Sequence, residues 1–288
     1  MKAFGLASLA LLAFAANSIL ARLALTETSI DPVSFTAVRL SSGAIVLGLI
    51  VAWRSADPPG RGSPVSALAL FVYALAFSLA YVSLTAATGA LLLFGAVQVS
   101  MVGWTLVRGE RLNLLAWLGF ALALGGLVWL LLPGLARPPI GPAGLMIAAG
   151  VAWAVYTLRA KAAGNPTRAT AMNFILAAMP ALALALILWP WASWDGAGLI
   201  LAVASGALAS GLGYVIWYSA LALIRNRTAA VAQLAVPVIT ALAGVLLLAE
   251  PLSVRVVLAG SIILAGMVLV IAPWQRNAAA KSTTAWPK

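Results

Sequence analysis

Long apolar runs alternate with short polar segments along nearly the whole chain. Each run is about twenty residues long, which is the length that an α-helix needs to cross the hydrocarbon core of a bilayer. Many of the gaps carry helix-ending Pro or Gly residues, as at Pro133-Gly134 and Asn165-Pro166. The pattern predicts ten membrane-spanning helices, over residues 3–25, 32–53, 65–86, 89–107, 112–132, 142–160, 169–190, 197–223, 228–249 and 253–273.

The composition agrees with this pattern. Apolar residues make up 64% of the chain and charged residues only 8%. Soluble domains contain about 45–50% apolar and about 25% charged residues, so no soluble fold of this length could bury so much apolar surface. We therefore predict an all-α integral membrane protein of ten transmembrane helices. The first apolar run is too long for the core of a secretory signal peptide, so we interpret it as a helix of the mature protein.

The formal net charge of +11 is distributed in a way that sets membrane orientation. Nearly all Lys and Arg residues fall in the terminal segments and in one alternating set of loops; the exceptions are Arg22, Arg39, Arg137 and Arg255. By the positive-inside rule both termini are predicted to be cytoplasmic, in a bacterial inner (plasma) membrane. The cations form no continuous basic face, so the expected partners are the lipid bilayer and a small-molecule substrate, not nucleic acid. The oligomeric state stays open.

The residue types that the chain lacks narrow its chemistry. It contains neither Cys nor His, which excludes Cys/His zinc sites and every Ser–His or Cys–His catalytic pair. We expect no cofactor, no metal and no catalytic residue, because an intramembrane enzyme would lack the usual general bases. No Asp or Glu lies deep in a predicted span, where cation exporters often hold a carboxylate. A solute bound between the spans is therefore expected to be neutral or zwitterionic, with an apolar body.

The second half of the sequence repeats the first. A shift of 140 residues places Glu110 on Glu250, and a shift of 137 residues in the earlier part of each half places Tyr81 on Tyr218. Each half contains five predicted spans, an odd number, so the two halves cross the membrane in opposite senses. Inverted repeats of this kind are found in many secondary transporters, where they expose a central site to either side in turn.

The order of features in residues 214–270 resembles a known family. An aromatic cluster is followed by small residues, a mid-helix Pro237, a Glu250-Pro251 turn and a Gly-rich last helix. This order resembles the second repeat of EamA-type transporters of the drug/metabolite transporter (DMT) superfamily. Residues 81–133 resemble the first repeat more weakly, with Val97 where the second half has Pro237. Within the superfamily the chain is most similar to the YddG-type aromatic amino acid exporters.

The resemblance covers residues 3–273 and implies a domain organisation. We expect a first EamA-like five-helix repeat over residues 1–138, a second, inverted repeat over residues 139–275 and a disordered cytoplasmic tail over residues 276–288. The resemblance also implies export and a central cavity lined mainly by the first, third, fourth, sixth, eighth and ninth spans.

Amides and aromatic rings deep in the spans are the candidates for substrate binding. A polar group in a span costs free energy unless it faces a cavity or a partner, and aromatic rings can stack on a ligand ring. Some aromatic candidates are spaced i,i+4, such as Phe77 and Tyr81, and so share one helix face. The candidates are Asn17, Phe77, Tyr81, Gln98, Trp153, Tyr156, Tyr214, Trp217, Tyr218 and Gln233. For each of them the alternative is ordinary helix packing or an interhelical hydrogen bond.

Prolines and small residues inside the spans suggest where helices bend or approach closely. Pro180 and Pro237 each remove a helical hydrogen bond and are candidates for hinge or gating positions, with a simple kink as the alternative. Pro237 is predicted near the middle of its span, where it frees the carbonyl of Gln233. Small residues over 205–213 would let neighbouring helices approach closely, or let a bulky substrate lie against the backbone.

Arg22 and Arg39 are the ionised residues that lie more than two residues from the end of a predicted span, and both are predicted toward the outer ends. Each could be a structural anchor or could attract a substrate carboxylate. Arg39 lies deeper and needs a partner, for which Glu27 and Asp31 are the candidates.

We predict a secondary transporter that exports small amphipathic metabolites, with aromatic or neutral amino acids as the expected substrates, by alternating access through a central cavity. The alternative is a broad-specificity exporter of drugs or other metabolites. A receptor or scaffold would need a partner surface, and no loop is long enough to provide one.

Overall fold

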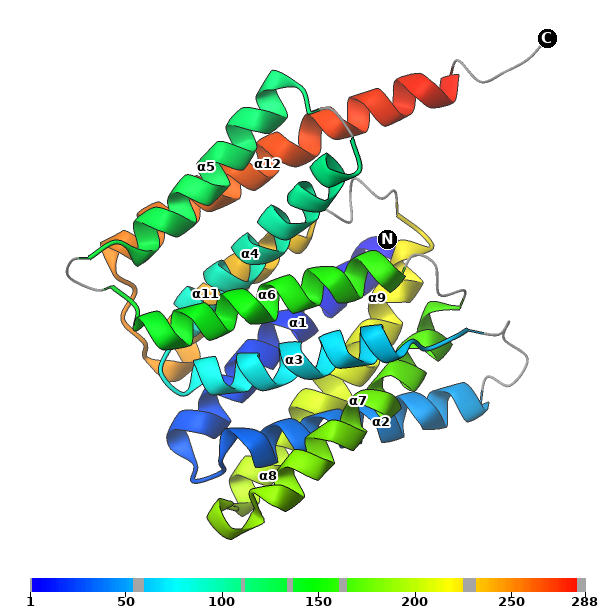
Figure 1. Ribbon diagram of the computed structural model, residues 1–288, viewed down its shortest axis with the longest axis vertical. Helices are drawn as coiled ribbons and strands as arrows, with labels where there is room; N and C mark the ends of the chain where they lie inside the picture. Colours follow the sequence, from blue (N-terminus) through cyan, green and yellow to red (C-terminus); the bar gives the residue numbers. More distant parts are fainter. Residues whose placement is uncertain are drawn as a thin grey trace.

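The computed structural model describes residues 2–53, 60–109, 112–133, 137–160, 165–224 and 232–283. These residues form a bundle of helices joined by short connections (Figure 1). The elements are α1 (Lys2–Glu27), α2 (Pro32–Trp53), α3 (Pro64–Tyr81), α4 (Ala86–Val107), α5 (Leu114–Leu131), α6 (Ile140–Ala160), α7 (Pro166–Ile187), the 3-10 turn η1 (Trp189–Trp191), α8 (Gly196–Val203), the π-helix η2 (Ala204–Leu212), α9 (Gly213–Leu221), α11 (Ala235–Leu248) and α12 (Val254–Thr283).

Nine helices of the described ranges are long and apolar enough to cross a membrane. One of them is the continuous helix Gly196–Leu221, which comprises α8, η2 and α9. The ninth predicted span corresponds to the shorter apolar helix α11, and residues 228–231 at its expected start lie outside the described residues. The predicted architecture of ten helices in an all-α membrane protein is confirmed.

The helix pairs show the internal repeat in three dimensions. α5 packs along α12 and α2 along α7, so equivalent helices of the two halves meet each other (Figure 1). α3 packs on α6, and the equivalent pair with the halves exchanged is α8–η2–α9 on α1. The contact of α4 with α6 is matched in the same way by that of α11 with α1. Exchanging the halves therefore preserves these contacts, as expected for an inverted repeat.

The boundary between α3 and α4 differs from the prediction of spans 65–86 and 89–107. α3 ends at Tyr81 and α4 begins at Ala86. The cause is a helix cap, since the Thr85 side chain accepts a hydrogen bond from the Thr88 backbone N–H at 3.3 Å. Apolar periodicity alone does not reveal this turn, because the small residues on both sides of it are compatible with a continuous helix.

The eighth span contains an unusually long π-helical segment, η2. Its small residues pack closely on α2, where a Cβ at Gly206 would overlap the carbonyl oxygen of Arg39. The close approach expected of the small residues over 205–213 is therefore present. Most π-helical segments are single turns and many occur at functional sites; this one brings Ser205 and Ser210 to the centre of the bundle, where both are buried.

α12 continues to Thr283 and so enters the segment 276–288 that was predicted to be a disordered tail (Figure 1). The run Ala278-Ala279-Ala280 explains the extension, because Ala has the highest intrinsic helix propensity. Residues 284–288 lie outside the described ranges.

Candidate functional site

A cavity of about 310 Å³ lies at the centre of the bundle. This volume is at the lower end of the range of about 300–1,000 Å³ that is typical of small-molecule sites. The helices α1, α3, α4, α6, η2 and α9 contribute to its wall, together with Pro166 at the start of α7 and Gln233 just before α11. Because η2 and α9 belong to the eighth span and Gln233 to the ninth predicted span, the wall comes from the first, third, fourth, sixth, eighth and ninth spans that the family resemblance implied. Pro166 of the seventh span is an addition.

Most of the predicted site residues converge on this cavity. Those in its wall are Asn17, Phe77, Trp153, Tyr156, Tyr214, Trp217, Tyr218 and Gln233. Two candidates do not line it. Tyr81 is fully buried, with its ring edge-on to Phe77 at 4.7 Å between centroids and its hydroxyl donating to the carbonyl of Ala86 at 3.4 Å. Gln98 is half-buried on α4, outside the cavity wall.

Trp153 is the centre of the aromatic wall. Its ring lies 4.9 Å from that of Tyr73, 5.4 Å from that of Tyr156 and 5.6 Å from that of Tyr214, measured between centroids. The pairs with Tyr156 and Tyr214 are stacked, with interplanar angles of 29° and 19°. Offset stacking favours such arrangements. The wall is therefore a connected layer of rings from α3, α6 and α9, against which a flat apolar group can lie.

Three aromatic wall residues were missed by the sequence analysis: Phe14, Tyr73 and Phe94. Tyr73 had a recognisable signal, because it lies one helical turn before Phe77 and extends the stripe of Phe77 and Tyr81. The 137-residue shift between the halves also places Tyr73 on Ser210, and both line the cavity. Phe14 and Phe94 carry no pattern that separates them from ordinary membrane-facing Phe residues.

A chain of polar contacts crosses the cavity wall between α1, α3 and η2. Ser205 Oγ donates to Asn17 Oδ1 at 2.7 Å, and Asn17 Nδ2 donates to the Tyr73 hydroxyl at 3.5 Å. The contact from Ser205 fixes the amide of Asn17 with its NH₂ group toward Tyr73. Both Asn17 and Tyr73 are in the cavity wall, so these contacts supply a polar patch within a largely apolar surface.

Arg39 lies behind this patch, on α2, with 2% of its surface exposed. Its Nη2 donates to the Tyr73 hydroxyl at 3.2 Å, and its guanidinium carbon lies 5.3 Å and 4.8 Å from the ring centroids of Tyr73 and Phe77. Its Nε and Nη1 have no hydrogen-bond partner among the described residues. Among the described residues, the Tyr73 hydroxyl is therefore the only polar partner of this buried cation.

The two acids considered as partners for Arg39 are occupied elsewhere. Asp31 caps α2, with its Oδ1 accepting the backbone N–H groups of Val33 and Ser34 at 2.9 and 3.0 Å. Glu27 is exposed and accepts a hydrogen bond from Thr26 at 3.4 Å. Within the described ranges neither acid forms an ion pair with Arg39.

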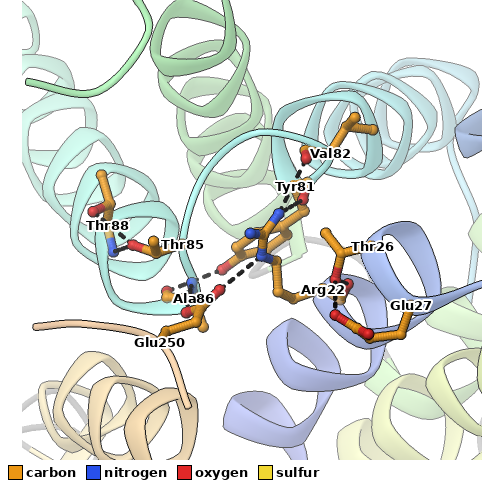
Figure 2. Close-up of polar contacts among 9 residues, drawn as sticks. All are labelled: Arg22, Thr26, Glu27, Tyr81, Val82, Thr85, Ala86, Thr88 and Glu250. Atoms are coloured by element: carbon orange, nitrogen blue, oxygen red, sulfur yellow. Dashed lines mark hydrogen bonds and ion pairs between the residues drawn. The ribbon is translucent and has the colours of Figure 1, made fainter. Parts of the chain in front are cut away.

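Arg22, in contrast, has an acidic partner and two backbone carbonyl partners at one end of the bundle (Figure 2). Its Nε donates to Glu250 Oε1 at 2.7 Å, and its Nη1 donates to the carbonyls of Tyr81 and Val82 at 2.8 and 3.1 Å. Glu250 Oε2 accepts the backbone N–H of Ala86 at 2.7 Å. This cluster, the Arg22 lock, ties α1 to the α3–α4 connection and to the segment between α11 and α12.

The cavity extends toward the opposite end of the bundle. Its wall there includes Thr157 near the end of α6, Pro166 at the start of α7 and Leu221 at the end of α9. A second cavity of about 210 Å³ adjoins at this Pro166 end and shares Tyr156 and Pro166 with the first. Arg61 and Arg159 are among its wall residues. The two ends of the bundle thus differ, because charge is neutralised at the Arg22 lock and is positive at the Pro166 end.

The two candidate hinge prolines occupy different positions. Pro180 lies inside α7, which continues through it. Pro237 lies in the first turn of α11, and a turn at Leu234 separates α11 from the helical residues Ala232 and Gln233. Residues 228–231, the first part of the predicted span, lie outside the described residues. A proline is tolerated in a first turn because the backbone N–H there has no helical acceptor to lose. Pro237 therefore marks the start of α11 beside Gln233.

Comparison with known proteins agrees with this architecture. The EamA-like transporter family model matches residues 1–132 and, a second time, residues 142–272. An uncharacterized protein of Pseudomonas aeruginosa is 53% identical over 266 residues, covering 92% of this chain and 93% of the relative. An uncharacterized transporter of Archaeoglobus fulgidus is 28% identical over 240 residues, covering 79% of this chain and 82% of the relative.

A crystal structure that is 19% identical in sequence has a TM-score of 0.65 and covers 93% of this chain and 96% of its own. At this identity the likeness shows the fold alone. The double family match spans nearly the whole chain and coincides with the two halves of the internal repeat. The chain therefore belongs to the EamA-like transporter family, within the drug/metabolite transporter superfamily.

Proposed function

We propose that the protein exports small amphipathic metabolites, principally aromatic and neutral amino acids, across a bacterial inner membrane. The observation that carries the proposal is the composition of the central cavity. Stacked rings around Trp153 offer a surface for an aromatic side chain, and the amides of Asn17 and Gln233 offer polar contacts beside it. The wall contains no Asp or Glu among its described residues, which disfavours an organic cation as the substrate.

The two ends of the bundle support alternating access as the mechanism. By the positive-inside rule the Pro166 end faces the cytoplasm and the Arg22 lock faces the outside. A cavity that extends to the Pro166 end while the other end is held by an ion pair has the form of a site loaded from the cytoplasm. Release then requires the Arg22 lock to open and the Pro166 end to close, and the inverted repeat allows both by one rocking motion.

Two matched pairs of variants test whether the cavity carries transport. Trp153→Ala removes the centre of the aromatic wall, and Trp117→Ala removes a Trp from α5, which does not line the cavity. Gln233→Ala removes a wall amide, and Gln98→Ala removes an amide from α4 outside the wall. In proteoliposomes we expect Trp153→Ala and Gln233→Ala to lower phenylalanine transport, by about tenfold or more for Trp153→Ala, while both controls transport normally.

Equal transport by all four variants at equal insertion would place the substrate path elsewhere. A broad-specificity drug exporter is the alternative function. It would transport a quaternary-ammonium dye through the same cavity with the same dependence on Trp153, and would show no preference for phenylalanine.

A further inference from the structure

We infer that Tyr73, Asn17 and Arg39 form a binding subsite for the carboxylate of an aromatic carboxylic acid. The inference deepens the proposed function and rests on it for the transport step, but the binding chemistry can be tested separately. Tyr73 and Asn17 touch the bound solute, while Arg39 acts through Tyr73 as a positioning residue and as the source of positive charge.

The first argument is the charge of Arg39. A buried guanidinium is costly unless a counter-charge or several hydrogen bonds compensate for its lost hydration. Here two of its nitrogen atoms have no partner in the described part of the chain, and no acid of that part pairs with it. The rings of Tyr73 and Phe77 stabilise the cation only in part. An anion that enters the cavity would supply the missing counter-charge.

The second argument is the direction of the hydrogen bonds around Tyr73. Its hydroxyl oxygen accepts from Asn17 Nδ2 at 3.5 Å and from Arg39 Nη2 at 3.2 Å. Neither of these groups can accept a hydrogen bond in return. The hydroxyl hydrogen of Tyr73 is therefore available, and no described residue accepts it. A hydroxyl that already accepts a bond from a cation is a stronger donor, and its preferred acceptor is a carboxylate.

The third argument is the relation of this hydroxyl to the aromatic wall. The ring of Tyr73 lies 4.9 Å from the ring of Trp153, so the donor and the stacking surface are neighbours in one cavity. A solute that uses both has a ring and a carboxylate a few bonds apart. No carboxylate of the described wall residues is available for an ammonium group. The structure thus assigns the main polar recognition to the carboxylate of the substrate and not to its amine.

Binding of three probes to the full-length protein in nanodiscs tests the inference. The probes are phenylalanine, 3-phenylpropionate, which lacks the amine, and phenethylamine, which lacks the carboxylate. Affinity is measured from the rise in melting temperature with probe concentration. We expect the wild type to bind phenylalanine and 3-phenylpropionate at least about tenfold more tightly than phenethylamine, because the carboxylate gains a charge-assisted hydrogen bond.

Tyr73→Phe removes only the hydroxyl and should lower the affinity for both carboxylate probes by about tenfold or more, with little change for phenethylamine. The matched control is Tyr156→Phe, which removes another wall hydroxyl, one that donates to Thr170 Oγ1 at 3.3 Å. It should affect all three probes alike. Arg39→Lys keeps the charge and should retain part of the carboxylate preference, whereas Arg39→Gln should abolish it.

Two outcomes would overturn the subsite: a wild type that binds no carboxylate probe more tightly than phenethylamine, or a Tyr73→Phe variant that weakens all probes equally. The subsite and the proposed function can fail separately. Selective carboxylate binding that depends on Tyr73, without phenylalanine transport, would refute the exporter and keep the subsite. Phenylalanine transport with an unchanged carboxylate preference in Tyr73→Phe would keep the exporter and refute the subsite.

Discussion

Arg22 in α1 and Arg39 in α2 are both largely shielded from solvent, but their surroundings differ. Arg22 has a carboxylate and two backbone carbonyls within hydrogen-bonding distance, and its partner Glu250 is bonded in turn to a backbone N–H (Figure 2). Arg39 is more deeply buried, yet its polar contact is one tyrosine hydroxyl.

From this difference we propose that the two buried charges serve different purposes. The Arg22 lock is complete in itself and connects segments that must separate if that end of the cavity is to open. The site around Arg39 is incomplete in itself and lies against the cavity wall. We interpret the Arg22 lock as a contact that closes the outer end of the cavity, and the site around Arg39 as part of a ligand-binding site.

Breaking the Arg22 lock should have the largest effect on stability. The two side chains are only 17% and 11% exposed, so Arg22→Ala leaves a largely buried carboxylate without its cation. We expect a loss of about 3 kcal/mol in the free energy of unfolding, measured by thermal unfolding in detergent. The control is Glu27→Gln, which changes an exposed acid on the same helix and should have little effect.

Arg22→Ala should also open the outer end of the cavity. The chain contains no Cys, so Ser18→Cys in the cavity wall provides a single reporter. We expect a membrane-impermeant maleimide to label it in intact cells when Arg22→Ala is also present and to label it slowly otherwise. Labelling at an unchanged rate would mean that the ion pair does not control access.

Removing the hydrogen bond from Ser205 that holds Asn17 should lower stability by an intermediate amount. Ser205→Ala deletes the hydrogen bond to Asn17 Oδ1 and leaves a buried acceptor unpaired, which should cost about 1 kcal/mol of stability and weaken phenylalanine binding. Ser219→Ala is the matched control, because the hydroxyl of Ser219 donates within its own helix, to the carbonyl of Val215. Equal losses of stability and of phenylalanine binding in the two variants would show that the Ser205–Asn17 hydrogen bond does not support the binding site.

Arg39→Met should change stability much less than Arg22→Ala. The variant loses a cation over two rings but also removes a buried charge for which the described part of the chain offers no ion-pair partner, and the two effects oppose each other. We expect the free energy of unfolding to change by less than about 1 kcal/mol, well below the loss for Arg22→Ala. A loss as large as that of Arg22→Ala would show that Arg39 is a structural anchor.

Ala249→Gly should have the smallest effect and should be stabilising. Ala249 has a φ of 50°, a left-handed conformation that favours Gly, in the turn that presents Glu250 to Arg22. We expect a gain of about 0.5 kcal/mol in thermal unfolding. Ala243→Gly, in the interior of α11, should instead lose up to about 1 kcal/mol.

Much of the fold could be predicted from the sequence because lipid imposes simple rules on length and charge. The spans, the repeat and the family resemblance follow from patterns that extend over many residues. The cap at Thr85 and the π-helix η2 could not be predicted in this way, because they depend on local hydrogen bonds. The helical extension of α12 to Thr283 depends on the local propensity of its alanines, which the polar composition of residues 276–288 conceals.

The candidate site could be predicted in part for a similar reason. Deep aromatic residues and amides signal a cavity as a class, and most of those chosen do converge. The sequence does not say on which side of its helix a residue such as Gln98 or Tyr81 lies relative to the cavity. That no acid of the described residues pairs with Arg39 is a three-dimensional fact, and only the structure shows that Tyr73, a residue of the cavity wall, contacts this cation.

The most direct test of the central claim is uptake of labelled phenylalanine by liposomes that contain the purified protein, with no ion gradient applied. We predict saturable uptake that is competed by tryptophan and not by a quaternary-ammonium dye. Movement of the dye without movement of phenylalanine would contradict it.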